Sequence, residues 1–122
     1  MGKKVKKGMS AKEIATLHYQ LAMNNEYDEW LKTLEKFHRD RAESRGSKPQ
    51  LYWKTARRYV DELGYSYKFK EKVDRQSDDD HIKFFFHRLS KEGKAQGTGQ
   101  VPIHVVKDED ENNEWRVDIT SW

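Results

Sequence analysis

Apolar positions in the first half of the chain recur with the period of an α-helix. Ser10 and Glu13 have the spacing of a capping box, in which each side chain satisfies a backbone N–H at a helix start. The 3.6-residue period that follows predicts a helix to about Met23. A second run predicts another helix, whose single apolar stripe consists of Tyr27, Trp30, Leu31, Leu34 and Phe37.

A third helix is predicted after residues 38–49, a charged segment without an apolar period. Ser47 and Gln50 repeat the capping-box spacing, and Gly64 is typical of the left-handed residue that follows a helix. The stripe of this helix consists of Tyr52, Ala56, Tyr59, Val60 and Leu63. We therefore expect the helical half of the chain to end at Gly64.

After Gly64 the period changes from 3.6 to 2, which is typical of strands with one buried and one wet face. The connections between the alternating segments are polar and short enough for hairpins, so an antiparallel meander is the simplest topology. Helices that precede an antiparallel sheet indicate an α+β fold, here three N-terminal helices packed on four strands. The four predicted strands are residues 65–73, 81–89, 100–107 and 115–121.

Charge and composition restrict the class of protein. The chain has 122 residues, 24 of them Lys or Arg and 21 Asp or Glu, and no cysteine. Its basic excess lies in residues 1–9, which we expect to be a disordered arm before a single domain, residues 10–122. Without cysteine there is no disulfide or thiolate metal site, and no apolar stretch has the length of a signal or membrane span. We expect a cytoplasmic protein.

The order of helices and strands, closed by the segment NNEWRVDITSW, resembles the nuclear transport factor 2-like superfamily. Trp115, Arg116 and Val117 match a Trp-basic-aliphatic pattern on the last strand of that family. The resemblance covers residues 10–122 and implies a strongly bent sheet that wraps the helices into a cone. The family's small hairpin would fall in residues 38–50, which lack strand-like alternation, so we expect an open or trimmed cone there. Cystatin-like folds are the nearest alternative.

This superfamily contains isomerases, dehydratases and cyclases as well as binding proteins, so the fold does not decide the function. None of the family's acid–base motifs matches this chain. We therefore expect a non-catalytic small-ligand or protein-binding module without a cofactor; a pocket enzyme that uses His18 or Asp118 is the alternative. Hydroxyl groups on an apolar wall suit a small aromatic or carbonyl ligand, and the residues expected to line such a pocket are His18, Tyr19, Tyr52, Tyr59, Tyr67 and Phe69.

The outer face of the predicted sheet is a candidate dimer interface. Because side chains alternate along a strand, Phe84 and Phe86 point toward the helices, and Phe85 points outward. Exposed apolar groups on a sheet often mark an interface. The residues that we expect in a homodimer contact are Phe85, His87, Val106, Arg116 and Trp122.

Two groups of residues have the composition of metal sites. Hairpins centred near residues 95 and 96 and at Glu111 would align His87, His104 and Asp118 in one row, which could bind a divalent metal or transfer a proton. A slip of one residue would separate them, and an exposed polar row is the alternative. We therefore assign no metal to this row.

The second group has oxygens at alternate positions, as in the first part of a calcium loop. Its sixth position is Asn113 instead of glycine, and its twelfth is Ile119 instead of a carboxylate. We therefore expect a solvated hairpin turn. The oxygen-bearing residues of this segment are Asp108, Asp110, Asn112 and Glu114.

A nucleic-acid-binding accessory protein is a second alternative. Basic and aromatic side chains together can bind phosphates and stack on bases. Acidic runs at residues 78–80 and 108–111 oppose a general polyanion surface. This alternative depends on the N-terminal lysines and on Arg39, Arg41, Arg45, Arg57 and Arg58 beside Trp53 and Tyr59.

Overall fold

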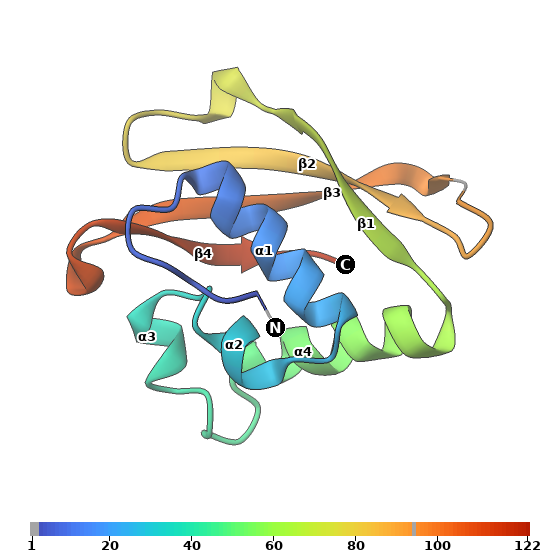
Figure 1. Cartoon of the computed structure of the whole chain (residues 1–122), viewed down its shortest axis with the longest axis horizontal. Coiled ribbons are helices and arrows are strands. Elements are labelled where there is room, and N and C mark those ends of the chain that lie inside the picture. The colour runs from blue at the N-terminus through green and yellow to red at the C-terminus, as the bar shows by residue number, and fades with distance from the viewer. Residues whose placement is uncertain (1–2, 94) are drawn as a thin grey trace.

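The computed structural model of the chain describes residues 3–93 and 95–122, with residues 95–98 described by their backbone alone. It has an α+β fold in which helices precede a four-stranded antiparallel sheet (Figure 1). The helical elements are α1 (Ala11–Met23), α2 (Tyr27–Leu31), α3 (Lys36–Arg39), α4 (Lys48–Arg57) and a π-helical turn (Arg58–Glu62). The strands are β1 (Ser66–Lys72), β2 (His81–Leu89), β3 (Ala95–Asp108) and β4 (Glu114–Thr120), with 3₁₀ turns at Asp74–Gln76 and Glu109–Glu111.

Helix α1 begins at the predicted capping box, which is confirmed. The Ser10 hydroxyl accepts from the Glu13 N–H at 3.1 Å, and the Glu13 carboxylate accepts from the Ser10 N–H at 2.9 Å. In Figure 1 α1 crosses in front of the sheet. Its sheet-facing side is buried and consists of Ala11, Ile14, Ala15, Leu17, His18, Tyr19, Leu21 and Ala22.

The predicted second helix is instead two short helices, α2 and α3, joined by a turn and a short extended segment at Leu34 and Glu35. In this segment Leu34 pairs in parallel with Val117 of β4. The Val117 N–H donates to the Thr33 carbonyl at 2.7 Å, and the Glu35 N–H donates to the Val117 carbonyl at 3.1 Å. These bonds cover part of the free edge of β4, which would otherwise leave backbone groups unpaired. Phe37, predicted on the buried stripe, is 55% exposed.

The third helix begins and ends at the predicted residues. The Ser47 hydroxyl accepts from the Gln50 N–H at 3.4 Å, so the capping bond at the start of α4 is present. The helix continues through the π-helical turn to Gly64, whose φ of +70° is the left-handed conformation expected after a helix.

The sheet is the predicted meander, with strand order β1-β2-β3-β4. Strand β2 has the predicted bounds, and β3 begins at Ala95 instead of residue 100. Phe84 pairs with Ile103, and both side chains are buried on the inner face, against the helices. The other strand residues of the hydrophobic core are Tyr67, Phe86, Val101, Val105 and Val117.

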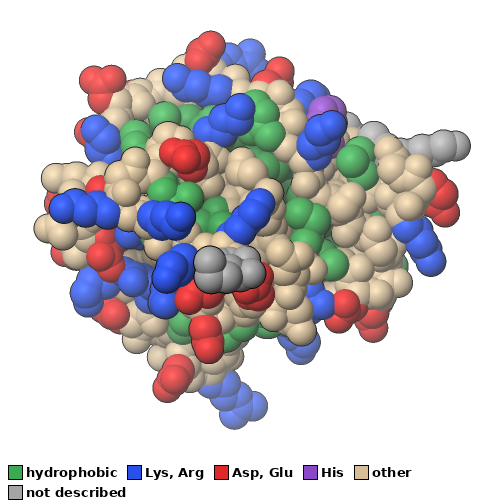
Figure 2. Space-filling model, viewed as in Figure 1, with side chains coloured by type: hydrophobic (Ala, Val, Ile, Leu, Met, Phe, Trp, Pro, Cys, Tyr) green, Lys and Arg blue, Asp and Glu red, His purple; other side chains and the backbone are tan. Residues whose placement is uncertain are grey.

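The described part of the N-terminal arm, residues 3–9, lies against the domain. Lys3 Nζ donates to Gln20 Oε1 at 3.0 Å, and Val5 packs against the core. The disorder expected from the arm's composition stays a prediction. Figure 2 shows acidic and basic side chains interspersed over the face that α1 and the arm occupy.

In the described part of the chain, every helix is too short or too polar to cross a bilayer.

Candidate functional site

The face of the sheet opposite the helices, called the outer face below, carries an apolar centre. Phe84 and Phe86 are 3% and 1% exposed, so the alternation of side chains directs Phe85 to the outer face. Phe85 pairs with Pro102 of β3, and both are half-buried. Half-buried Val106 lies farther along the same face, and Ile119 of β4 is 42% exposed. The two central strands and β4 thus present apolar side chains away from the core.

Two stacked histidines lie beside this apolar centre. The rings of His81 and His104 are 4.9 Å apart and nearly parallel, and His81 Nε2 lies 2.7 Å from His104 Nδ1. Burial lowers the pKa of His104, and the nearby charges of His81 and Lys83 lower it further. One ring nitrogen therefore donates to the other.

Two of the predicted dimer residues differ from the expectation. Trp122 is 6% exposed and lies in the core, where its ring is 5.3 Å from that of His18. Asp118 is an extra residue in β4, so the side chains that follow it face the side opposite to the one that strict alternation predicts. Arg116 pairs with Val106 but is only 8% exposed. Of the other predicted contacts, Phe85, His87 and Val106 are half-buried.

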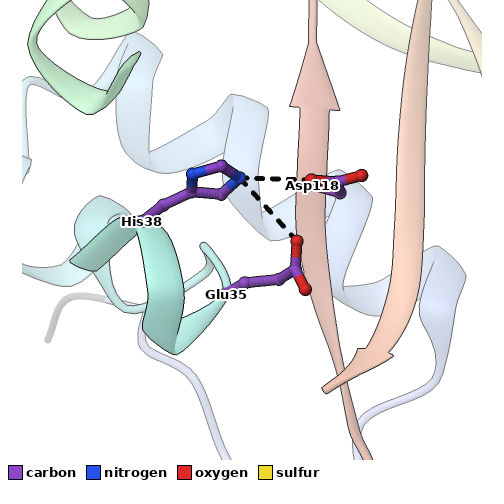
Figure 3. Close-up of side chains that lie close together, drawn as sticks. All are labelled: Glu35, His38 and Asp118. Carbon is purple, nitrogen blue, oxygen red and sulfur yellow. Dashed lines mark hydrogen bonds and ion pairs between the residues drawn. The ribbon is translucent and has the colours of Figure 1, made fainter. Parts of the chain in front are cut away.

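A cluster of three ionisable side chains lies at the edge of β4 (Figure 3). His38 Nε2 is 3.1 Å from Asp118 Oδ1 and 3.7 Å from Glu35 Oε1. The His38 side chain is 7% exposed, that of Glu35 21% and that of Asp118 36%. The cluster is therefore partly shielded from water and open on one side.

Two local features bring these three residues together. Glu35 and His38 stand three residues apart at the start of α3, so their side chains lie on the same side of the turn. Opposite them, the pairing of β3 with β4 shifts: Val105 pairs with Val117 and His104 with Ile119. Asp118 is the additional residue of this β-bulge, and a bulge redirects a side chain.

The two carboxyl groups of the cluster have opposite pKa shifts. Burial and the neighbouring Asp118 carboxylate raise the pKa of Glu35 to about 7. The hydrogen bond from His38, together with Glu35 and the positive charge of Lys48, lowers the pKa of Asp118 to about 2. One carboxyl group is thus ionised at neutral pH, while its neighbour is close to half protonated.

The predicted row of His87, His104 and Asp118 does not form. His87 pairs with Gln100, and His104 pairs with Lys83 on one side and Ile119 on the other. The turn between β2 and β3 lies before residue 95 instead of near residues 95 and 96, and the bulge in β4 moves Ile119 opposite His104. Of these three residues only Asp118 belongs to the cluster. Its other two members, Glu35 and His38, were not among the predicted site residues. Their helical i,i+3 spacing was the available signal.

The predicted pocket residues occupy two environments. His18 and Tyr19 are 0% and 1% exposed and belong to the packed core. His18 Nδ1 is 2.9 Å from the Thr33 hydroxyl, and Nε2 is 3.1 Å from the Thr120 hydroxyl. Tyr67 is also buried and stacks on Tyr19. The remaining predicted residues, Tyr52, Tyr59 and Phe69, are half-buried at the edge of the core.

Two pockets among the described residues lie elsewhere. One, of about 1020 Å³, lies between the arm and α1, with Met9 and Leu17 among four lysines: Lys3, Lys4, Lys6 and Lys12. Lys12 Nζ is 4.2 Å from the centre of the Phe69 ring. The other, of about 320 Å³, is lined by His38, Phe37, Arg41, Ser44, Ser47, Lys48 and Pro49.

The segment with the spacing of a partial calcium loop forms a turn between β3 and β4, as expected. The Asp108 carboxylate accepts from the Lys36 N–H at 2.8 Å and from the Asp110 N–H at 3.0 Å. Asn112 and Asn113 have φ values of +56° and +61°. Both carboxylate oxygens of Asp108 thus satisfy backbone donors.

The arginines of the nucleic-acid alternative make contacts within the chain. Arg57 donates to Asp61 at 2.6 Å and to the Ala22 carbonyl at 2.6 Å. Arg39 forms an ion pair with Glu111. Arg41 stacks over the Phe37 ring. Groups held in this way are less available to phosphates.

The chain was also compared with protein-family models and with curated proteins, and nothing matches it in either comparison.

Proposed function

We propose that this protein is a non-catalytic binding module of the nuclear transport factor 2-like type, which forms a homodimer through the outer face of its sheet. One observation supports this most directly: Phe85 and Pro102 form a half-buried apolar pair in the middle of the sheet, facing away from the helices. Apolar side chains on the solvent-facing side of a sheet often mark an interface, which needs such groups at its centre.

A second copy of the chain fits this face. Phe85 and Pro102 lie on neighbouring central strands, β2 and β3. A twofold axis parallel to the strands places β2 of one copy over β3 of the other, so that each Phe85 packs on the partner's apolar centre. The same rotation brings β1 of one copy over β4 of the other.

Replacing Phe85 with glutamate is expected to give a folded monomer. Burial of one Phe contributes about 1.5–3 kcal/mol per subunit, so its loss shifts a micromolar dimer strongly toward monomer. The measurement is sedimentation equilibrium at micromolar concentration, with circular dichroism as a test of folding.

The matched control is Leu51→Glu, because Leu51 of α4 is 57% exposed and lies outside the outer face. This variant should remain dimeric. The dimer is refuted if the unmodified protein sediments as a monomer, or if Phe85→Glu remains a dimer.

The small-ligand part of the proposal is supported by the pocket between the arm and α1. Its four lysines surround apolar side chains, an arrangement that suits an anionic ligand with an apolar part. We expect 1-anilinonaphthalene-8-sulfonate to bind there with enhanced fluorescence. The double variant Lys6→Glu/Lys12→Glu should weaken binding by about tenfold or more, since two attractive charges become repulsive.

The control for this experiment is Lys32→Glu/Lys54→Glu, which makes the same change of charge away from the pocket. Equal loss of binding in both double variants would assign the effect to net charge and contradict a site in this pocket.

A further inference from the structure

We propose that Glu35, His38 and Asp118 bind one zinc ion, through one imidazole nitrogen and two carboxylate oxygens. This inference goes beyond the proposed dimer and ligand pocket and depends on neither. It rests on three groups that converge from separate parts of the chain, α3 with the residue before it and a bulge in β4 (Figure 3).

The distances between the ligand atoms suit a tetrahedral ion. Zinc binds nitrogen and carboxylate oxygen at about 2.0–2.2 Å, so two ligand atoms of a tetrahedron stand about 3.3–3.6 Å apart. His38 Nε2 lies 3.1 Å from Asp118 Oδ1 and 3.7 Å from Glu35 Oε1, on either side of that range. All three ligand atoms lie within 4.8 Å of one another. Small side-chain movements would complete the geometry.

The ligand types favour zinc over the common hard cations. Magnesium and calcium prefer oxygen ligands throughout, whereas imidazole suits zinc and other transition metals. Three protein ligands leave a fourth position for water, as in zinc sites of the open type. His38 also lines the pocket of about 320 Å³, which Phe37 and Lys48 border.

The surroundings of the cluster are compatible with a cation. Asp108 is close enough to influence Glu35 and adds negative charge, while Lys48 acts on Asp118 with positive charge. The two carboxyl groups of the cluster, held in partly buried positions, repel each other when both are ionised. A divalent ion between the two carboxylates would neutralise this repulsion. It would bind to side chains whose positions the fold already determines.

The test is a calorimetric titration of the untagged, metal-free protein with zinc chloride. We expect one equivalent to bind at micromolar concentration and to raise the melting temperature. His38→Gln and Asp118→Asn should each weaken binding by about tenfold or more, since each removes a ligand. Cobalt(II), used as a spectroscopic probe, should give the visible absorption of a tetrahedral site with the unmodified protein only.

A third variant keeps the test decisive if either substitution disturbs folding. Glu35→Gln removes a charge from the carboxyl pair, so the metal-free variant should be at least as stable as the unmodified protein while zinc no longer stabilises it. If Glu35 had only a structural role, the substitution would change the stability of the metal-free protein and leave stabilisation by zinc intact.

The control replaces the two stacked histidines of the outer face. His81→Gln/His104→Gln should bind zinc as the unmodified protein does, because the stacked rings lie on the outer face, outside the cluster. The inference is overturned if the unmodified protein binds no stoichiometric zinc. It is equally overturned if the double histidine variant abolishes binding and the cluster variants do not.

Discussion

Replacing Trp30 with alanine is expected to lower the free energy of unfolding by about 3–5 kcal/mol, the usual range for removing a buried Trp from a core. Trp30 is 0% exposed. Its ring lies 5.0 Å from Trp53, 5.4 Å from His18 and 5.9 Å from Tyr27. These neighbours come from α1, α2 and α4 and cannot all move into the cavity, so most of the lost contact energy would remain lost.

The matched control is Phe37→Ala. Both aromatic residues fall on one stripe of the predicted second helix, but Phe37 is 55% exposed. Its replacement should change the stability by about 0.5 kcal/mol or less. Urea unfolding followed by circular dichroism measures both. Similar losses for the two variants would contradict the break between α2 and α3.

Acidification from pH 7 to pH 5 is expected to destabilise the protein by about 2 kcal/mol through His18 alone. Burial lowers the pKa of His18 to about 3, whereas an unfolded histidine titrates near 6.5. The unfolded chain therefore binds a proton below pH 6.5 that the folded protein does not. The stability that neutral His18 supports is present above pH 6.5 and is lost as the pH falls toward 3.

His18→Gln isolates this contribution. Glutamine stays neutral and can still bond to Thr33 and Thr120. Between pH 7 and pH 5 the variant should therefore lose about 2 kcal/mol less stability than the unmodified protein. Glu35, with its raised pKa, has the opposite pH dependence over part of this range, but it is present in both proteins and cancels in their difference. Equal pH dependence of the two proteins would refute the prediction.

The hydrogen bonds of His18 also predict its tautomer. The Thr33 hydroxyl donates to the Trp30 carbonyl at 2.6 Å and must therefore accept from His18 Nδ1. The Nδ1–H form then leaves Nε2 to accept from the Thr120 hydroxyl. Nitrogen chemical shifts of the ring, followed down to pH 4, should show this neutral tautomer throughout.

Local patterns in the sequence determined most of the elements. The bonds at Ser10 and Ser47 and the left-handed turn at Gly64 involve residues at most four apart, so their geometry is fixed by neighbours in the chain. The alternation in β2 likewise decided that Phe84 and Phe86 are buried. Period and capping are local properties, and a sequence displays them directly.

Only the tertiary structure decided what happens between Lys32 and Glu35. The apolar spacing there suits a helix, but the Glu35 N–H and the Thr33 carbonyl bond to Val117 of β4, because a free sheet edge offers unpaired donors and acceptors. Trp122 lies in the core for a similar reason: the extra residue in β4 reverses the face toward which the following side chains point. The local spacing of apolar residues contains no information about contacts with a strand that is distant in the sequence.

The candidate zinc cluster divides in the same way. The spacing of Glu35 and His38 is a local signal, and it predicts side chains on one side of a helical turn. Asp118 lies 80 residues beyond His38 and reaches it through a β-bulge. A bulge changes the direction of every following side chain, yet it depends on how two strands pack and not on their alternation. The sequence therefore determined which residues could act as ligands, and the packing of α3 against β4 decided which of them meet.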